Sequence, residues 1–222
     1  MSDIFERFGL DAEDRAAWEA TSGIDFEDWL TDRIARRPEG ARARLVYGAD
    51  DVHDFARAAI LGALGLGPGD RLLDIGCGGG LLLCDALATG AAATGLDHSD
   101  EMVRLARERA PGADVVAGDA EALPFADGAF TAVSMSVVFL FLPRPVAVLR
   151  ECRRVLAPGG RLAVYTTAPE LRGTPAAPEP LAARGFFHDD AELASLAREA
   201  GFAGVAVTNR DGGQLLTARS AG

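Results

Sequence analysis

The sequence predicts an α/β protein built on a doubly wound sheet of seven strands, with an antiparallel last strand and an N-terminal helical segment before the sheet. Three observations carry this prediction. From residue 71 onward, short apolar runs of strand length alternate with longer helical segments. A glycine-rich turn joins the first strand to its helix. Near the end, Asp211-Gly212 stands between two strand-like runs, a strong hairpin signal that makes the final strand run antiparallel to its neighbours.

The expected elements follow one another in a regular order. Strands are predicted at 71–75, 92–96, 115–117, 129–136, 161–167, 204–209 and 214–219. Helices are predicted at 81–88, 102–110, 145–156 and 189–200, with Ser99 or Asp100 capping the second of them. Because strands and helices alternate, most of the sheet should be parallel.

The glycine-rich turn lies at residues 72–83, between two apolar runs. Asp74 comes at the end of the first strand, and open α/β sheets bind ligands at the carboxyl ends of their strands. Glycine adopts positive φ readily, so Gly76, Gly78 and Gly80 allow the backbone to approach a bound molecule closely. The helix that follows begins with unpaired N–H groups. The turn is therefore a candidate ligand-binding loop.

The residues before the sheet mix acids, arginines and spaced aromatic side chains. Amphipathic helices are expected at 12–20 and 26–35, and a further helix at 52–64 with Asp50 or Asp51 as its N-cap. The aromatic rings have two interpretations: they form the packed faces of these helices, or they roof a pocket over the sheet. The rings concerned are Phe5, Phe8, Trp18, Phe26, Trp29 and Tyr47. We expect one domain over 1–222, with a helical cap at 1–68 and a core at 69–222. Residues 169–187, rich in proline, are expected to form a mobile lid loop without regular structure.

The composition indicates which classes of molecule the protein can bind. The formal net charge is −11, which argues against nucleic acid and anionic membranes, since both require a basic face. All basic residues are arginine, so a P-loop and Schiff-base chemistry are excluded. The three cysteines show no metal-ligand spacing, and reduced thiols indicate the cytoplasm. No apolar stretch is long enough to span a bilayer. We expect a small-molecule partner, no metal, no membrane insertion, and a monomer or homodimer.

The glycine pattern discriminates between cofactors. The dinucleotide fingerprint would place its third glycine where Leu81 stands, so that match fails. Residues 74–80 instead read D-x-G-x-G-x-G. This pattern resembles the class I S-adenosylmethionine (SAM) dependent methyltransferases, and in particular the small-molecule branch that includes the ubiquinone and menaquinone methyltransferases. The resemblance implies a Rossmann-like fold with SAM as methyl donor and S-adenosylhomocysteine as product.

The resemblance also assigns cofactor-binding residues. Asp74, Gly76, Cys77 and Gly78 fit the first motif of the family. Asp97 ends the second strand, 17 residues beyond Gly80, near the separation at which such folds place an acid for ribose hydroxyls. The resemblance gives Asp97 the SAM ribose, and gives His98 a position that packs against adenine. An exposed histidine near a helix start is the alternative for His98.

A second motif lies at residues 118–125, Gly-Asp-Ala-Glu-Ala-Leu-Pro-Phe, and matches a family segment nearly letter for letter. It implies that the Asp119 carboxylate accepts from the adenine amino group and that the Ala120 N–H donates to the ring. An Asx turn at Asp119 is the local alternative. Ser136, at the end of the fourth strand, is implied to lie where the methionine moiety meets the substrate.

The sequence also departs from the family. Thr131 stands where aspartate is common, and Leu140 and Phe141 stand where histidine or tryptophan is common. We expect these changes to make one wall of the pocket apolar and to remove proton acceptors. The signature of amino-methylating DNA enzymes is missing as well, which again disfavours nucleic acid.

The expected activity is methyl transfer from SAM to an oxygen, carbon or nitrogen of a small, fairly apolar molecule. The alternatives are a SAM-binding protein of the same fold that does not methylate and, less favoured, a nicotinamide (NAD(P)) oxidoreductase. No catalytic residue is assigned. The candidate bases are His188, which could instead cap the following helix, Tyr47, His53, whose simplest interpretation is a solvent-facing side chain, and Tyr165.

Overall fold

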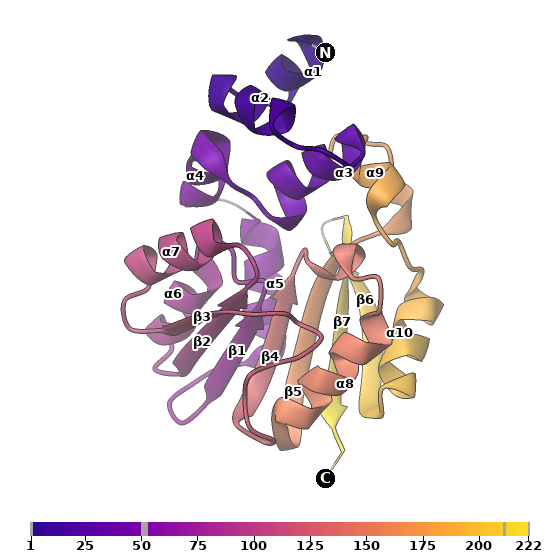
Figure 1. Cartoon of the computed structure of the whole chain (residues 1–222). Coiled ribbons are helices and arrows are strands. Elements are labelled where there is room, and N and C mark those ends of the chain that lie inside the picture. The colour runs from indigo at the N-terminus through magenta and orange to yellow at the C-terminus, as the bar shows by residue number, and fades with distance from the viewer. Residues whose placement is uncertain (1, 50–52, 211, 222) are drawn as a thin grey trace.

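The computed structural model describes residues 2–49, 53–210 and 212–221. Its centre is a seven-stranded sheet in the order β3-β2-β1-β4-β5-β7-β6 (Figure 1). The strands are β1 Arg71–Ile75, β2 Ala92–Asp97, β3 Asp114–Ala117, β4 Phe130–Ser136, β5 Leu156–Thr167, β6 Phe202–Arg210 and β7 Gly213–Ser220.

The sheet is parallel except at β7, which runs antiparallel to both β5 and β6. The predicted Rossmann-like sheet with a reversed last strand is therefore confirmed. The plain dinucleotide fold has no such reversed strand in its usual order. The turn residue Asp211 lies outside the described residues.

Two layers of helices cover the sheet. The helices α5 Asp54–Leu64, α6 Leu81–Ala88 and α7 Asp100–Arg109 bury side chains such as Ile60 and Leu83 on one face. The helices α8 Pro145–Val155 and α10 Asp190–Glu199 bury side chains such as Leu149 and Leu193 on the other. Because helices lie on both faces, the parallel strands are apolar along most of their length.

The chain before α5 forms a group of helices above the carboxyl ends of the strands (Figure 1). We call residues 2–49 the cap. Its elements are α1 Ser2–Arg7, α2 Ala12–Glu19, α3 Phe26–Thr31, the π-helix Asp32–Arg36 and α4 Gly40–Gly48. The predicted helix at 26–35 is thus present, but its second half is wound as a π-helix. Such segments often lie at functional sites.

The aromatic rings of the cap pack on one another. Phe26 lies with its ring centroid 4.9 Å from that of Trp18 and 6.0 Å from that of Trp29. Phe5 is buried in the same cluster. The interpretation as packed helix faces is correct for these rings, and of the six aromatic residues only Tyr47 lines the cavity described below.

The helix α5 was grouped with the cap at the sequence level, because it precedes β1. In the structure it packs on the sheet, where Ala56, Ile60 and Leu64 join the core of that face. The proposed caps Asp50 and Asp51 lie outside the described residues.

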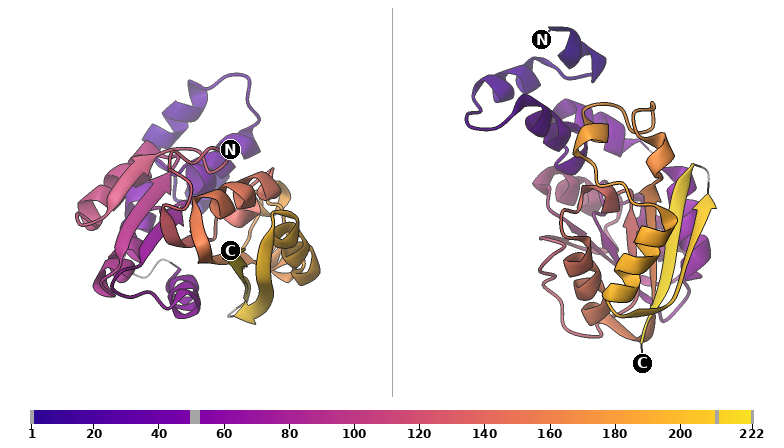
Figure 2. Two further views of the ribbon diagram at one scale, coloured as in Figure 1. Left: turned by 90° about the horizontal axis from the view of Figure 1, so that it is seen from below. Right: turned by 90° about the vertical axis from the view of Figure 1, so that its right-hand side faces the viewer.

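Residues 169–187 have more structure than the prolines suggested. They contain the short 3₁₀ helix Pro169–Leu171, a β-bridge between Arg172 and Ala177, and the helix α9 Leu181–Arg184. The expectation of no regular structure was wrong, because the prolines stand at helix starts and in turns, where they are tolerated. The α9 turn lies against the cap (Figure 2), where the Arg184 guanidinium pairs with the Asp25 and Asp28 carboxylates.

One strand boundary also differs. The fifth strand was expected to begin at Arg161 but begins at Leu156. The pairing shifts between Phe130, opposite Leu156, and Ala132, opposite Arg161. The Pro158-Gly159-Gly160 turn signal is therefore an irregularity inside the strand, as glycines in strands often are.

Candidate functional site

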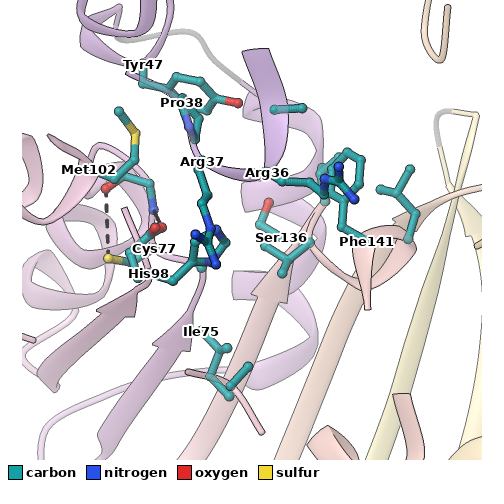
Figure 3. Close-up of a pocket in the computed structure, with 18 of the residues that line it drawn as sticks. Arg36, Arg37, Pro38, Tyr47, Ile75, Cys77, His98, Met102, Ser136 and Phe141 are labelled. Carbon is teal, nitrogen blue, oxygen red and sulfur yellow. Dashed lines mark hydrogen bonds between the residues drawn. The ribbon is translucent and has the colours of Figure 1, made fainter. Parts of the chain in front are cut away.

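A cavity of about 1020 Å³ lies between the cap and the carboxyl ends of β1, β2 and β4. Figure 3 shows side chains from the cap and from the sheet edge converging on it. The strand order reverses between β1 and β4, since β2 follows on one side of β1 and β5 on the far side of β4. This is the position at which doubly wound sheets bind their ligands. The volume is at the upper end of the range for small-molecule sites.

The glycine loop forms part of the cavity floor. Positive φ occurs at Gly76, Gly78 and Gly80 (69°, 51° and 83°), as the alternating glycines predicted. The N–H groups of Gly76 and Cys77 both donate to the Leu96 carbonyl, at 2.7 and 3.1 Å. The loop is therefore tied to β2. Burial raises the pKa of the Cys77 thiol well above its usual range, so this cysteine stays protonated.

Asp97 is fixed by the same loop. Its carboxylate accepts hydrogen bonds from the Gly78 N–H and from the Ser99 N–H, both at 2.9 Å. Each oxygen thus uses one acceptor position on the protein and keeps another. The side chain is only 6% exposed yet lines the cavity. Burial raises its pKa, while the two N–H donors oppose that rise.

Asp74 lies deeper, at the end of β1. Its carboxyl accepts a hydrogen bond from the Ser134 hydroxyl at 2.7 Å. Burial, together with the nearby charge of Asp97, raises the pKa of Asp74 to about 7. Two acids with raised pKa values therefore lie in one cleft, which is typical of functional sites.

The remaining predicted cofactor residues also line the cavity. His98, Asp119, Ala120 and Ser136 all contribute to its wall. His98 is exposed, and its imidazole faces the cavity. At Asp119 the Asx turn exists, since Oδ1 accepts the Glu121 N–H at 2.9 Å. This turn leaves Oδ2 available, so the two interpretations of Asp119 are compatible.

The end of β4 supplies the apolar wall. Val137 has a φ of +59°, a strained backbone for a β-branched residue, and its N–H donates to the Tyr165 carbonyl at 2.8 Å. Leu140 and Phe141 line the cavity, as expected. Thr131 does not, and its predicted influence on this wall was wrong. Its hydroxyl donates to the Asp70 carboxylate at the opposite end of the sheet.

The four candidate bases differ in whether they line the cavity. Tyr47 and His53 line the cavity, whereas His188 and Tyr165 do not. Burial raises the pKa of Tyr47 to about 12, and burial next to Arg57 lowers the pKa of His53. The expectation that His53 faces solvent was therefore wrong.

His188 lies outside the site and does not cap α10. Its ring packs against Phe139 at 6.0 Å between centroids, and the cap of α10 is Asp189. Tyr165 is buried in the sheet against Gly213.

Sequence reasoning missed how the cap is fastened over this site. The Arg109 guanidinium, at the end of α7, donates to the Tyr47 carbonyl at 2.8 Å and to the Gly79 carbonyl at 2.9 Å. The Ser99 hydroxyl donates to the Pro38 carbonyl at 2.9 Å. No local signal in the sequence pointed to this role of Arg109, because its partners Tyr47 and Gly79 are distant in the sequence.

Comparison with known proteins finds relatives of this chain. Residues 73–164 match the family described as a methyltransferase domain. This part of the chain is therefore similar to methyltransferase domains. A demethylmenaquinone methyltransferase from Beutenbergia cavernae is 40% identical over 142 residues, which is 63% of this chain and 58% of that protein. The chain thus spans somewhat more than half the length of this curated relative.

Solved structures agree on the fold. A phosphoethanolamine N-methyltransferase 2 from Haemonchus contortus, in complex with SAM, superposes with a TM-score of 0.75 at 17% identity, covering 90% of this chain and 61% of that chain. The [4+2]-cyclase SpnF superposes with a TM-score of 0.64 at 24% identity, covering 82% and 81%. At such identities the likeness shows the fold alone.

SAM is the cofactor that this domain implies, and the residues present fit it. The site offers two carboxylates with free acceptor positions for hydroxyl and amino groups, the buried Asp97 and the exposed Asp119. It also offers a loop without side chains at Gly76 and Gly79. A Cβ would lie 2.3 Å from a Val138 methyl carbon at the first position and 2.3 Å from the Tyr47 carbonyl oxygen at the second. Among residues 2–49, 53–210 and 212–221, no cluster of side chains could hold a metal ion, and no helix is long and apolar enough to cross a membrane.

Proposed function

We propose that the protein transfers a methyl group from SAM to a small, fairly apolar acceptor. The observation that carries the proposal is one cavity lined by the glycine loop, Asp97 and Asp119, with an apolar wall at the end of β4. The menaquinone-type relative supports a small aromatic or quinol-like acceptor.

The residues have distinct roles in this proposal. Asp97 holds the ribose hydroxyls with the acceptor positions that Gly78 and Ser99 leave open. Asp119 and Ala120 hold the adenine, with His98 against its face. The loop at 76–78, Asp74 and Ser136 surround the methionine moiety.

Bound SAM supplies a methyl group that its sulfonium charge already activates. The chain's own contribution is to align the acceptor and exclude water, and positioning of this kind lowers barriers by ~7–11 kcal/mol in favourable cases. The cap and the segment 169–187 close the cavity from above, and we propose that this segment acts as a lid. The Arg184 ion pairs with α3 would hold it shut.

Where the acceptor must lose a proton, we assign His53 as the base that takes it. It lines the cavity, and its lowered pKa keeps the imidazole neutral near pH 7 and able to accept. Its φ of +54° places it in the left-handed region at the start of α5, a strained geometry often found at functional sites.

Incubation with SAM carrying a labelled methyl group and a panel of phenols, quinols and amines tests the activity. Transfer of label to any acceptor supports the proposal. Binding of S-adenosylhomocysteine without transfer to any member would favour a SAM-binding protein that does not methylate. Binding of NAD in place of SAM would overturn the assignment altogether.

A further inference from the structure

The two walls of the cavity carry opposite charge. The sheet edge contributes acids, among them Asp74, Asp97 and Asp119. The cap contributes the arginines Arg36, Arg37 and Arg42 against one acid, Asp32. The chain as a whole has a net charge of −11, so this local excess of cations runs against its composition.

The three arginines differ in their partners. Arg36 is paired with the Asp32 carboxylate at 2.7 Å. Arg42 donates to the backbone carbonyls of Phe8 and Ile34, at 2.7 and 3.2 Å, and no acid among the described residues pairs with it.

Arg37 directly follows the π-helix. Within the described part of the chain its guanidinium has no hydrogen bond or ion pair. Figure 3 shows its side chain extending from the cap toward the sheet edge, above His98. A planar guanidinium aimed into a cavity, with all its donors open, is suited to bind a carboxylate in a bidentate way.

The same cavity also has an apolar surface. Val138, Leu140, Phe141 and the lid residue Leu181 line the same cavity. A molecule that fills this region therefore meets an apolar wall along its body and a positive charge at the cap.

We propose that the methyl acceptor is an apolar molecule carrying a carboxylate, and that Arg37 binds this carboxylate. The inference rests on the proposed function and names the class of its substrate. The carboxylate of SAM itself is the alternative ligand for Arg37. In the placement proposed above, that group lies with the methionine moiety at the glycine loop, which belongs to the opposite wall.

Calorimetry on the protein saturated with S-adenosylhomocysteine tests the inference, with naphthoate and its neutral counterpart naphthamide as probes. The wild-type protein should bind naphthoate about tenfold or more tightly than naphthamide. Arg37→Gln should abolish this preference and Arg37→Glu should reverse it. Arg150→Gln, an exposed arginine on α8 outside the cavity, is the matched control and should keep it.

The outcomes distinguish a failure of the carboxylate inference from a failure of the methyltransferase proposal. Equal binding of the two probes, or binding of neither, overturns the inference but leaves the methyltransferase proposal standing if S-adenosylhomocysteine binds. If Arg37→Gln instead weakens S-adenosylhomocysteine binding about tenfold or more, the carboxylate belongs to the donor and the inference is wrong. Failure of the wild-type protein to bind S-adenosylhomocysteine would refute the proposed function itself.

Discussion

Replacing Asp97 with alanine tests the cofactor site most sharply. The carboxylate keeps one acceptor position on each oxygen after bonding the Gly78 and Ser99 N–H groups. Hydrogen bonds to a charged group contribute about 1.5–3 kcal/mol each. Two ribose hydroxyls therefore account for about 3–6 kcal/mol, and we expect Asp97→Ala to weaken S-adenosylhomocysteine binding by about 10²–10⁴-fold.

Asp97→Asn should lie between the alanine variant and the wild type. Its one amide oxygen can accept from Gly78 or from Ser99 but not serve both as the carboxylate does, and the charge is lost. Asp127→Asn, at an exposed acid paired with Arg154, is the control and should bind normally.

Isothermal titration with S-adenosylhomocysteine and with its dideoxyribose analogue completes the cycle. The wild-type protein should lose affinity when the hydroxyls are removed, and Asp97→Ala should lose little more. An Asp97→Ala variant that binds S-adenosylhomocysteine as tightly as the wild type would refute the assignment of this carboxylate.

Three further predictions concern stability and catalysis. The raised pKa of Asp74 means that its contribution to stability is complete below pH 4 and is lost as the pH rises through about 7, by up to about 4 kcal/mol. Urea unfolding should therefore show a steeper decline from pH 4 to 7 for the wild type than for Asp74→Asn, and parallel profiles would contradict the buried, protonated acid. Gly79→Ala should lower the melting temperature, because its Cβ would lie 2.3 Å from a cap carbonyl oxygen, whereas Gly67→Ala, with open space around it, should not. With an acceptor that must lose a proton, His53→Gln should slow transfer by about 10²-fold or more, whereas His188→Gln should not. Equal rates for both variants would remove His53 from the mechanism.

Much of the fold could be predicted from local patterns. The glycine loop, the alternation of strands and helices and the Asp-Gly hairpin each depend on residues close together in the sequence. These patterns were sufficient to predict the sheet and its reversed β7. The early start of β5 could not be predicted, because it depends on the pairing of Leu156 with Phe130. The sequence carried no signal for the π-helix at Asp32–Arg36.

The residues of the site also fall into those that the sequence could place and those that it could not. Residues at the ends of β1, β2 and β4 could be placed, since the carboxyl ends of parallel strands share one edge of the sheet. The cap residues Arg37 and Tyr47 could not be placed, because the cap contacts residues distant in the sequence: Ser99 donates to the Pro38 carbonyl and Arg109 to the Tyr47 carbonyl. His53 was also misjudged: the sequence gives no sign that it lines the cavity, where burial lowers its pKa.

A crystal structure of the protein with S-adenosylhomocysteine measures the central claim most directly. The account predicts the ribose hydroxyls within hydrogen-bond distance of the Asp97 carboxylate and the adenine beside Asp119, below the cap. An adenosine bound elsewhere on the protein, or a ribose turned away from Asp97, would contradict it.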